Sequence, residues 1–282
     1  MQPWGSNTKP DSFNYNDLVK DDKTLLKWLL TMEVKGVTLI KKSPDDPDAG
    51  PKFIEHVGFV KPTHYGRRSP VIVRENSNNL AFSSVKLGLH NDLPQYYHQP
   101  GIILIHTVEQ HRGKGGESTI SDGLLAAEIL RRENPVAFDI LTKTNVYFWD
   151  KGQANINMES EEFYKINRGP IIGLNCDNKF EIMRVNNQIR DSHLDLPPDE
   201  VNSFYEAMKS LTDILQDNSY SFKMEDGDIL ALDNVRCLHG REKFDNASTR
   251  HLESSYLDWD ETLCKRRRLL EKLGIDITTQ TF

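Results

Sequence analysis

The sequence predicts a mainly β protein with flanking helices, built as an antiparallel double-sheet barrel or jelly roll. Many short segments of strand length are separated by turns, and the helical patterns fall between groups of strands instead of alternating with single strands. No linker, internal repeat or low-complexity segment divides the 282 residues, so one domain is expected over residues 1–282.

The first half of the chain begins with a polar stretch, residues 1–15, which is expected to be a tail. From Asn16 onward the apolar spacing predicts a helix with Asp21 or Asp22 as a cap. The segments that follow are expected to be a buried strand at 37–40, a turn-rich loop at 43–52, a helix or turn at 53–59, and strands at 71–73, 80–82, 87–93 and 101–108.

The second half continues with an alternating strand at 118–121, which predicts one exposed face. Residues 122–142 predict two helices separated at Pro135. The remaining expected elements are strands at 169–174, 180–185, 228–232 and 250–256, and helices at 198–215 and 260–273.

The composition excludes several classes of function. The net charge is −7 and the longest basic run is short, which disfavours nucleic-acid binding. No apolar stretch is long enough for a membrane span, and the N-terminus does not look like a signal peptide. Three scattered cysteines favour a reducing compartment, so we expect a cytoplasmic protein without a membrane or nucleic-acid partner.

The segment around His90 and Asp92 carries the clearest chemical signal. On a strand these two side chains point to the same face, and His239 follows an apolar strand far downstream. Two histidines and a carboxylate suit non-haem iron(II), because they leave positions open for a cosubstrate and dioxygen. A chance pairing of His90 with Asp92, and a structural role for His239 in the core, remain the alternatives on these residues alone.

Arg250 strengthens the metal hypothesis. It follows His239 by eleven residues and lies in an apolar-flanked segment that is expected to be a barrel strand. A guanidinium buried there requires an anion, and the far carboxylate of a dicarboxylate cosubstrate would supply one.

Longer blocks of the sequence resemble one family. The chain is similar to Fe(II)- and 2-oxoglutarate-dependent oxygenases, and specifically to the γ-butyrobetaine and trimethyllysine dioxygenase branch of the taurine dioxygenase superfamily, without the small zinc domain that often precedes the catalytic region. The resembling blocks are Asp21–Lys41, Gly58–Gly66, Asn78–Pro94, Gln99–Gln110, Gly115–Gly123, Met183–Ser192, Asp233–Glu242 and Thr249–Asp260.

The resemblance implies a double-stranded β-helix with His90, Asp92 and His239 holding iron(II). It implies that Arg250 and Ser118 bind 2-oxoglutarate, although Ser118 equally fits a turn hydrogen bond. Dioxygen would be the oxidant and ascorbate an accessory reductant. The partner would be a small molecule, and the family's habit of pairing allows a homodimer.

The resemblance also suggests substrate residues. Those that match the family's cage and carboxylate positions are Tyr65, Asn79, Phe82, Asn186, Asn187 and Tyr256. Ser69 and Leu93 replace expected aromatic residues, which weakens a cage for a trimethylammonium group. Arg67 adds a cation nearby and would welcome a carboxylate instead, although it equally fits a solvated loop.

We therefore expect oxidation of an unactivated C–H bond in a small amino-acid-like or carboxylate-bearing metabolite, with release of succinate and carbon dioxide. The alternatives are a γ-butyrobetaine-type hydroxylase and an oxidative cyclase resembling kainoid synthases. Outside this class, the same residues would fit a zinc hydrolase or a non-catalytic barrel that binds 2-oxoglutarate.

Overall fold

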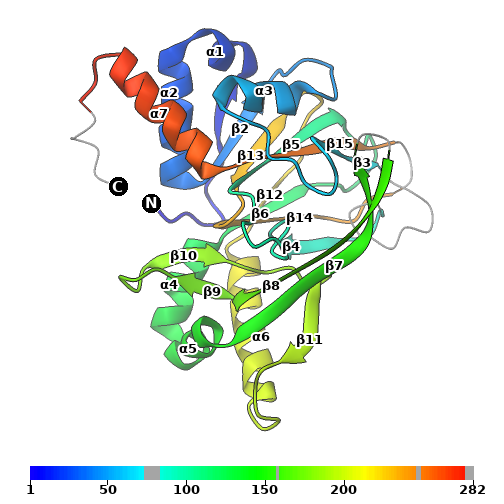
Figure 1. Ribbon diagram of the computed structural model, residues 1–282, viewed down its shortest axis with the longest axis vertical. Coiled ribbons are helices and arrows are strands. Elements are labelled where there is room, and N and C mark those ends of the chain that lie inside the picture. The colour runs from blue at the N-terminus through cyan, green and yellow to red at the C-terminus, as the bar shows by residue number, and fades with distance from the viewer. Residues whose placement is uncertain (73–82, 157–158, 246–248, 277–282) are drawn as a thin grey trace.

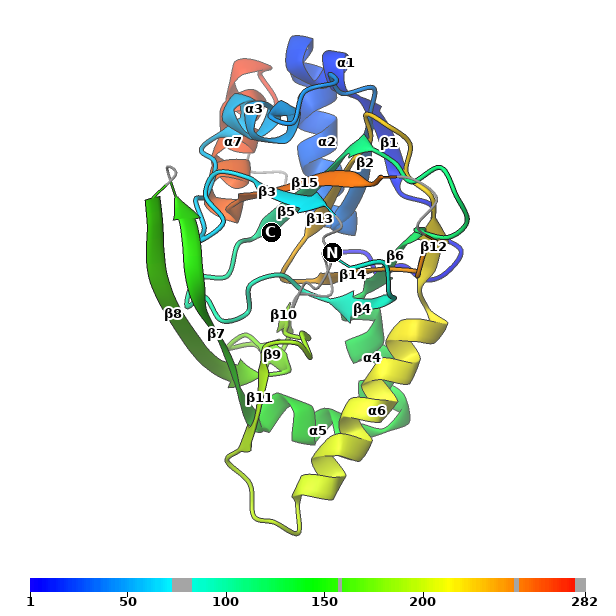
Figure 2. The same cartoon turned by 90° about the vertical axis from the view of Figure 1, so that its right-hand side faces the viewer.

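The computed structural model describes residues 1–72, 83–156, 159–245 and 249–276. Within these ranges two antiparallel-rich sheets face each other, as Figure 2 shows, and a long hairpin closes one side. The predicted mainly β architecture with flanking helices is therefore confirmed. None of the helices in the described part of the chain combines the length and apolar character needed to cross a bilayer.

The larger sheet has six strands among the described residues. In sheet order they are β1 (Asp11–Asn14), β2 (Val37–Lys41), β13 (Ile229–Asp233), β5 (Ile102–Glu109), β15 (His251–Leu257) and β3 (Ser69–Ile72). Apart from the parallel β1–β2 pair, neighbouring strands are antiparallel.

The smaller sheet contributes four described strands, β12 (Tyr220–Phe222), β6 (Ser118–Asp122), β14 (Cys237–Arg241) and β4 (Leu87–His90). Between the two sheets lies an apolar cluster that includes Ile103, Ile120 and Leu232. β6 was expected to have an exposed face, but all five of its residues are buried, because α6 covers the side that faces away from the other sheet.

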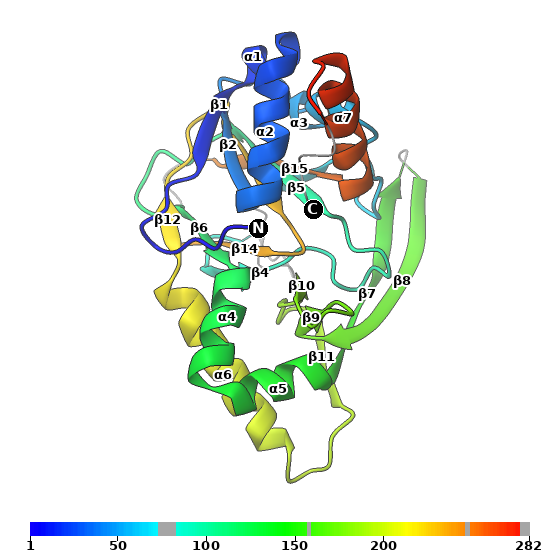
Figure 3. The ribbon, with the colours of Figure 1, turned by 90° about the vertical axis from the view of Figure 1, so that its left-hand side faces the viewer.

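Helices cover both outer faces. Figure 1 shows α1 (Tyr15–Lys20), α2 (Asp22–Lys35), α3 (Ala49–Val57) and α7 (Trp259–Lys272) on the large sheet, and α4 (Gly123–Glu133), α5 (Pro135–Lys143) and α6 (Val201–Asp217) on the small one. From the opposite side, Figure 3 shows α2 and α7 lying next to each other. The expected single helix from Asn16 is two helices, because Asp21 accepts a hydrogen bond from the N–H of Thr24 and caps α2.

Residues 1–15 are not the expected tail. They include β1, and Trp4 is buried with its indole N–H donating to the carbonyl of Lys35. The guanidinium of Arg236, itself buried, donates to the carbonyl of Gln2 and to both carboxylate oxygens of Asp122. The N-terminal segment is therefore fixed to the core by hydrogen bonds.

The long hairpin was not predicted. It consists of β7 (Asn145–Ile156) and β8 (Glu159–Pro170), with β11 (Arg190–Leu194) paired to β7, while β9 (Ile172–Leu174) and β10 (Phe180–Met183) form a separate small pair. Its inward residues reach the loop after β4: the amide of Asn167 donates to the carbonyls of Pro94 and Tyr96. This hairpin thus forms one wall beside the candidate site.

Candidate active site

His90, Asp92 and His239 come together at the end of the small sheet. His90 on β4 lies directly opposite His239 on β14, with ring centroids 4.3 Å apart. The potential ligand atoms of the three residues all lie within 4.8 Å of one another. Oδ1 of Asp92 is 3.3 Å from Nε2 of His90 and 3.7 Å from Nε2 of His239.

β4 ends at His90, so Asp92 lies just beyond the strand on which it was expected. Two asparagines hold this segment in place. The N–H of Asp92 donates to the side chain of Asn234, whose own amide donates to the carbonyl of Asp92. The amide of Asn91 donates to the carbonyls of Asn234 and Cys237. These hydrogen bonds of Asn91 and Asn234 keep Asp92 beside the two histidines, although Asp92 is not paired with a neighbouring strand.

The remaining hydrogen bonds orient the three ligand atoms toward one point. Nδ1 of His90 is 2.9 Å from the carbonyl oxygen of Gly88, which can only accept, so Nε2 carries the lone pair. The hydroxyl of Tyr256 donates to Oδ2 of Asp92 at 2.7 Å, which leaves Oδ1 facing the two histidines. Two imidazole nitrogens and one carboxylate oxygen converging in this way fit a non-haem iron(II) ion.

The electrostatics of Asp92 and His239 agree with a cation-binding role, whereas the contact with Asp92 outweighs burial and raises the pKa of His90. Burial alone would raise the pKa of Asp92, but the contacts with His90, His239 and Tyr256 outweigh it and hold that pKa well below its usual range. Burial, aided by His90, lowers the pKa of His239 to about 4. A charged carboxylate and a neutral imidazole are the forms that bind metals.

Arg250 lies just before β15 and is 4% exposed. Its Nε donates to Oε1 of Gln110 at 3.3 Å, and its guanidinium lies over the ring of Phe244. Burial, together with the neighbouring Arg241, lowers the pKa of Arg250 to about 9. In the described part of the chain no carboxylate forms an ion pair with Arg250, so this buried cation can accept the anion of a ligand.

Ser118 is buried on β6 and lies opposite Arg241 in the sheet register. Directly opposed residues project to the same face of a sheet, so the hydroxyl and the guanidinium share the barrel interior. Burial lowers the pKa of Arg241 to about 10, and its guanidinium donates to the carbonyls of Ser83 and Val85. Ser118, Arg241 and Arg250 form a polar end to the barrel.

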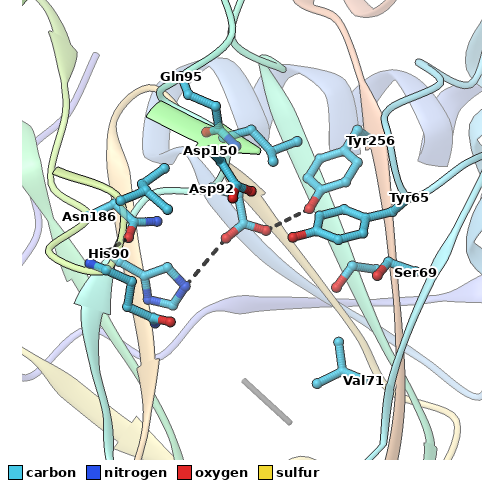
Figure 4. Close-up of a pocket in the computed structure, with 13 residues that line it drawn as sticks. Tyr65, Ser69, Val71, His90, Asp92, Gln95, Asp150, Asn186 and Tyr256 are labelled. Atoms are coloured by element: carbon cyan, nitrogen blue, oxygen red, sulfur yellow. Dashed lines mark hydrogen bonds and ion pairs between the residues drawn. The ribbon is translucent and has the colours of Figure 1, made fainter. Parts of the chain in front are cut away.

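A cavity of about 310 Å³ opens beside Asp92. Several of the sequence-predicted substrate residues line it, and Figure 4 shows Tyr65, Ser69, Asn186 and Tyr256 around the carboxylate. Leu93 lines it as well and adopts a left-handed backbone with φ of 58°. A leucine rarely adopts this conformation, which marks the turn beyond Asp92 as constrained by its surroundings.

Other expected substrate residues are not in the cavity. Asn187 is exposed and accepts a hydrogen bond from Arg190. Arg67 points to the surface and pairs with Glu55, so it adds no cation to the cavity. Asn79 and Phe82 lie outside the described residues. The expectation that a cation near Ser69 would welcome a carboxylate is therefore wrong.

The neighbouring Arg68 does not line the cavity either, because it forms ion pairs with Asp48 and the buried Glu253.

Sequence reasoning missed six lining residues: Val71, Gln95, Asp150, Gln188, Ile189 and Ser254. Alternation along the predicted strand would have placed Ser254 on the face of Arg250 and Tyr256. Asp150 could not be found, because it lies on β7, which was not predicted.

The chain belongs to the TauD/TfdA family of taurine catabolism dioxygenases, whose family model matches residues 1–256. The chain is thus an Fe(II)/2-oxoglutarate-dependent dioxygenase by family. It is 33% identical to human γ-butyrobetaine dioxygenase over 278 residues, covering 96% of this chain and 70% of the relative. It is 28% identical to human mitochondrial trimethyllysine dioxygenase over 264 residues, covering 92% of this chain and 60% of the relative.

Solved structures agree on the fold. Asparagine oxygenase in complex with Fe(II), hydroxyasparagine and succinate superposes with a TM-score of 0.64 at 13% identity, over 89% of this chain and 86% of that one. These structural neighbours are oxygenases with a double-stranded β-helix, which confirms the predicted barrel.

Proposed function

We propose that His90, Asp92 and His239 hold iron(II), and that this centre oxidises an unactivated C–H bond of a small amino-acid-like metabolite. The convergence of the three ligand atoms within 4.8 Å carries the proposal. Bound iron(II), together with 2-oxoglutarate and dioxygen, supplies the oxidant for such a bond, with release of succinate and carbon dioxide. Three protein ligands leave room for a bidentate cosubstrate beside the metal.

The protein's own residues orient and enclose the reactants. Arg250 pairs with the distal carboxylate of 2-oxoglutarate, and Ser118 donates a hydrogen bond at the same end of the barrel. This assignment is supported by the burial of Arg250, whose side-chain partner among the described residues is the amide of Gln110 and not a carboxylate. Tyr256 fixes the rotamer of Asp92, while Leu93 and the hairpin wall limit water around the reacting bond.

A γ-butyrobetaine-type hydroxylase is the second candidate. It is supported by the 33% identity to human γ-butyrobetaine dioxygenase and by two tyrosines, Tyr65 and Tyr256, in the cavity wall. Against it stand Ser69 and Leu93, which supply no aromatic face at positions where a cage would need one. Each missing cation–π contact lowers the binding free energy of a trimethylammonium group by about 0.5–2 kcal/mol.

The test is iron(II)-dependent formation of succinate from 2-oxoglutarate, with oxygen uptake recorded in the same reaction. Asp92→Ala is expected to abolish both, because it removes the anionic ligand. Asp213→Asn, which alters an exposed carboxylate on α6, is the matched control. Full turnover in Asp92→Ala would refute the ligand assignment. A zinc hydrolase would show no oxygen uptake, and a non-catalytic barrel would bind 2-oxoglutarate without turnover.

The remaining expectations are a homodimer and a cytoplasmic location. Both stay predictions, and light scattering on the purified protein tests the first.

A further inference from the structure

The cavity carries an unexpected charge. Apart from His90 and Asp92, its one charged lining residue in the described part of the chain is Asp150, and neither lysine nor arginine lines it. Asp150 lies on β7 and projects from the hairpin wall toward the cavity, as Figure 4 shows. A second carboxylate in this cavity repels an anionic group on that side and attracts a cationic one.

No cation of the protein neutralises Asp150 among the described residues. Among the described residues, the basic atom that contacts Asp150 is Nε2 of His64, 3.9 Å from its Oδ2, and burial lowers the pKa of His64 to about 4. That imidazole is therefore neutral at physiological pH. Burial also raises the pKa of Asp150 itself, partly offset by the backbone N–H of Lys151.

Lys165 lies directly opposite Asp150 in the β7–β8 register and is the obvious internal counterion. Its ammonium instead lies over the ring of Tyr96, 4.6 Å from the centroid, and within the described chain it makes no ion pair with Asp150. The carboxylate thus remains available to a ligand.

Gln95 gives an independent indication of a ligand. It is 2% exposed and lines the same cavity, yet its Oε1 is buried without a hydrogen-bond partner among the described residues. Figure 4 shows it on the wall beyond Asp92, toward Asp150. An unpaired buried acceptor is costly, so a ligand that donates a hydrogen bond to it would gain affinity.

We propose that Asp150 and Gln95 form the subsite for a protonated, N–H-bearing nitrogen at the side-chain end of the substrate, either an ammonium or a guanidinium group. The inference rests on the proposed function and narrows its substrate class. Two oxygen acceptors, one of them anionic, favour a cation that carries N–H donors, and a quaternary ammonium has none. The substrate class is therefore a basic amino acid or a related amine.

The experiment measures binding by calorimetry to the protein loaded with Mn(II) and 2-oxoglutarate, which avoids turnover. The probes are L-lysine, L-arginine and agmatine, compared with Nε-trimethyl-lysine, Nε-acetyl-lysine and norleucine. At least one probe with an N–H cation at its side-chain end is expected to bind about tenfold or more tightly than the analogue whose side chain is trimethylated or uncharged. Asp150→Asn should weaken that cation by about tenfold, and Gln95→Leu should weaken it less.

The same variants should leave binding of norleucine within about twofold, and Asp213→Asn should change nothing. Four outcomes overturn the inference: equal binding of probes with and without a side-chain cation, preference for the quaternary ammonium, binding of none of the side-chain cations, or undiminished binding in Asp150→Asn. Each of these outcomes leaves Mn(II) and 2-oxoglutarate binding intact. Failure to bind Mn(II) and 2-oxoglutarate counts against the proposed function instead, and amine binding to the unloaded protein then decides the subsite.

Discussion

Replacing Arg250 by methionine separates a cosubstrate-binding role from a structural one. Methionine keeps much of the side chain's length and removes the charge. The guanidinium is 4% exposed, burial with the neighbouring Arg241 lowers its pKa to about 9, and in the described chain no carboxylate pairs with it. The protein without cosubstrate therefore holds a poorly solvated cation. We expect the variant without cosubstrate to unfold at or above the wild-type temperature.

The affinity of the same variant for 2-oxoglutarate should fall, although its stability without cosubstrate does not. Truncating one partner of a buried, hydrogen-bonded charge pair costs about 2–5 kcal/mol. At about 1.4 kcal/mol for each factor of ten, the dissociation constant should rise roughly 30-fold to several thousand-fold.

Thermal unfolding with Mn(II), recorded over a titration of 2-oxoglutarate, measures both effects. Cosubstrate at a hundred times its dissociation constant adds about 2.7 kcal/mol to the stability of the wild type, or roughly 5 °C in unfolding temperature for a chain of this size. Arg250→Met should show almost none of this shift at the same concentration. The matched control is Arg184→Met, whose guanidinium donates to the carbonyl of Pro170 away from the cavity. A full shift in Arg250→Met would refute the assignment.

Three further predictions follow from individual contacts. Tyr256→Phe removes the hydrogen bond to Asp92 and should weaken Mn(II) binding about tenfold with little loss of stability; unchanged affinity would show that the bond does not position the ligand. Burial lowers the pKa of His106 to about 4, so the unfolded chain binds more protons below pH 6.5 and stability should fall by up to about 3 kcal/mol between pH 6.5 and 4. Denaturant titrations should show a flatter pH profile in His106→Asn, and an identical profile would contradict this account. Arg236→Met leaves Asp122 buried without its partner and should cost about 3–5 kcal/mol in unfolding free energy; a loss below 1 kcal/mol would mean that the pair is dispensable.

The sequence was sufficient to bring His90, Asp92 and His239 together as one candidate site, because residue spacing and chain order are simple signals. The strand period brought attention to His90 and Asp92, although Asp92 lies beyond the end of β4 and is placed by Asn234, which no local pattern showed. For Arg250, the cost of burying a guanidinium was signal enough.

The hairpin and the cavity wall could not be predicted, for a physical reason. β7 and β8 mix polar and apolar residues, and their register is set by long-range contacts such as Asn167 with the loop after β4. The N-terminal residues were misjudged because their polarity conceals single anchors such as Trp4, which only the folded chain brings into contact with the core.

The pairing of His90 with His239 across β4 and β14 has a consequence for assembly. A slip of β14 by one residue would turn its imidazole to the opposite face of the sheet and leave the other two donors without a third. A bound ion would thus fix the register of β4 against β14. Amide protons at the end of β4 should then exchange with deuterium more slowly once a divalent ion is added.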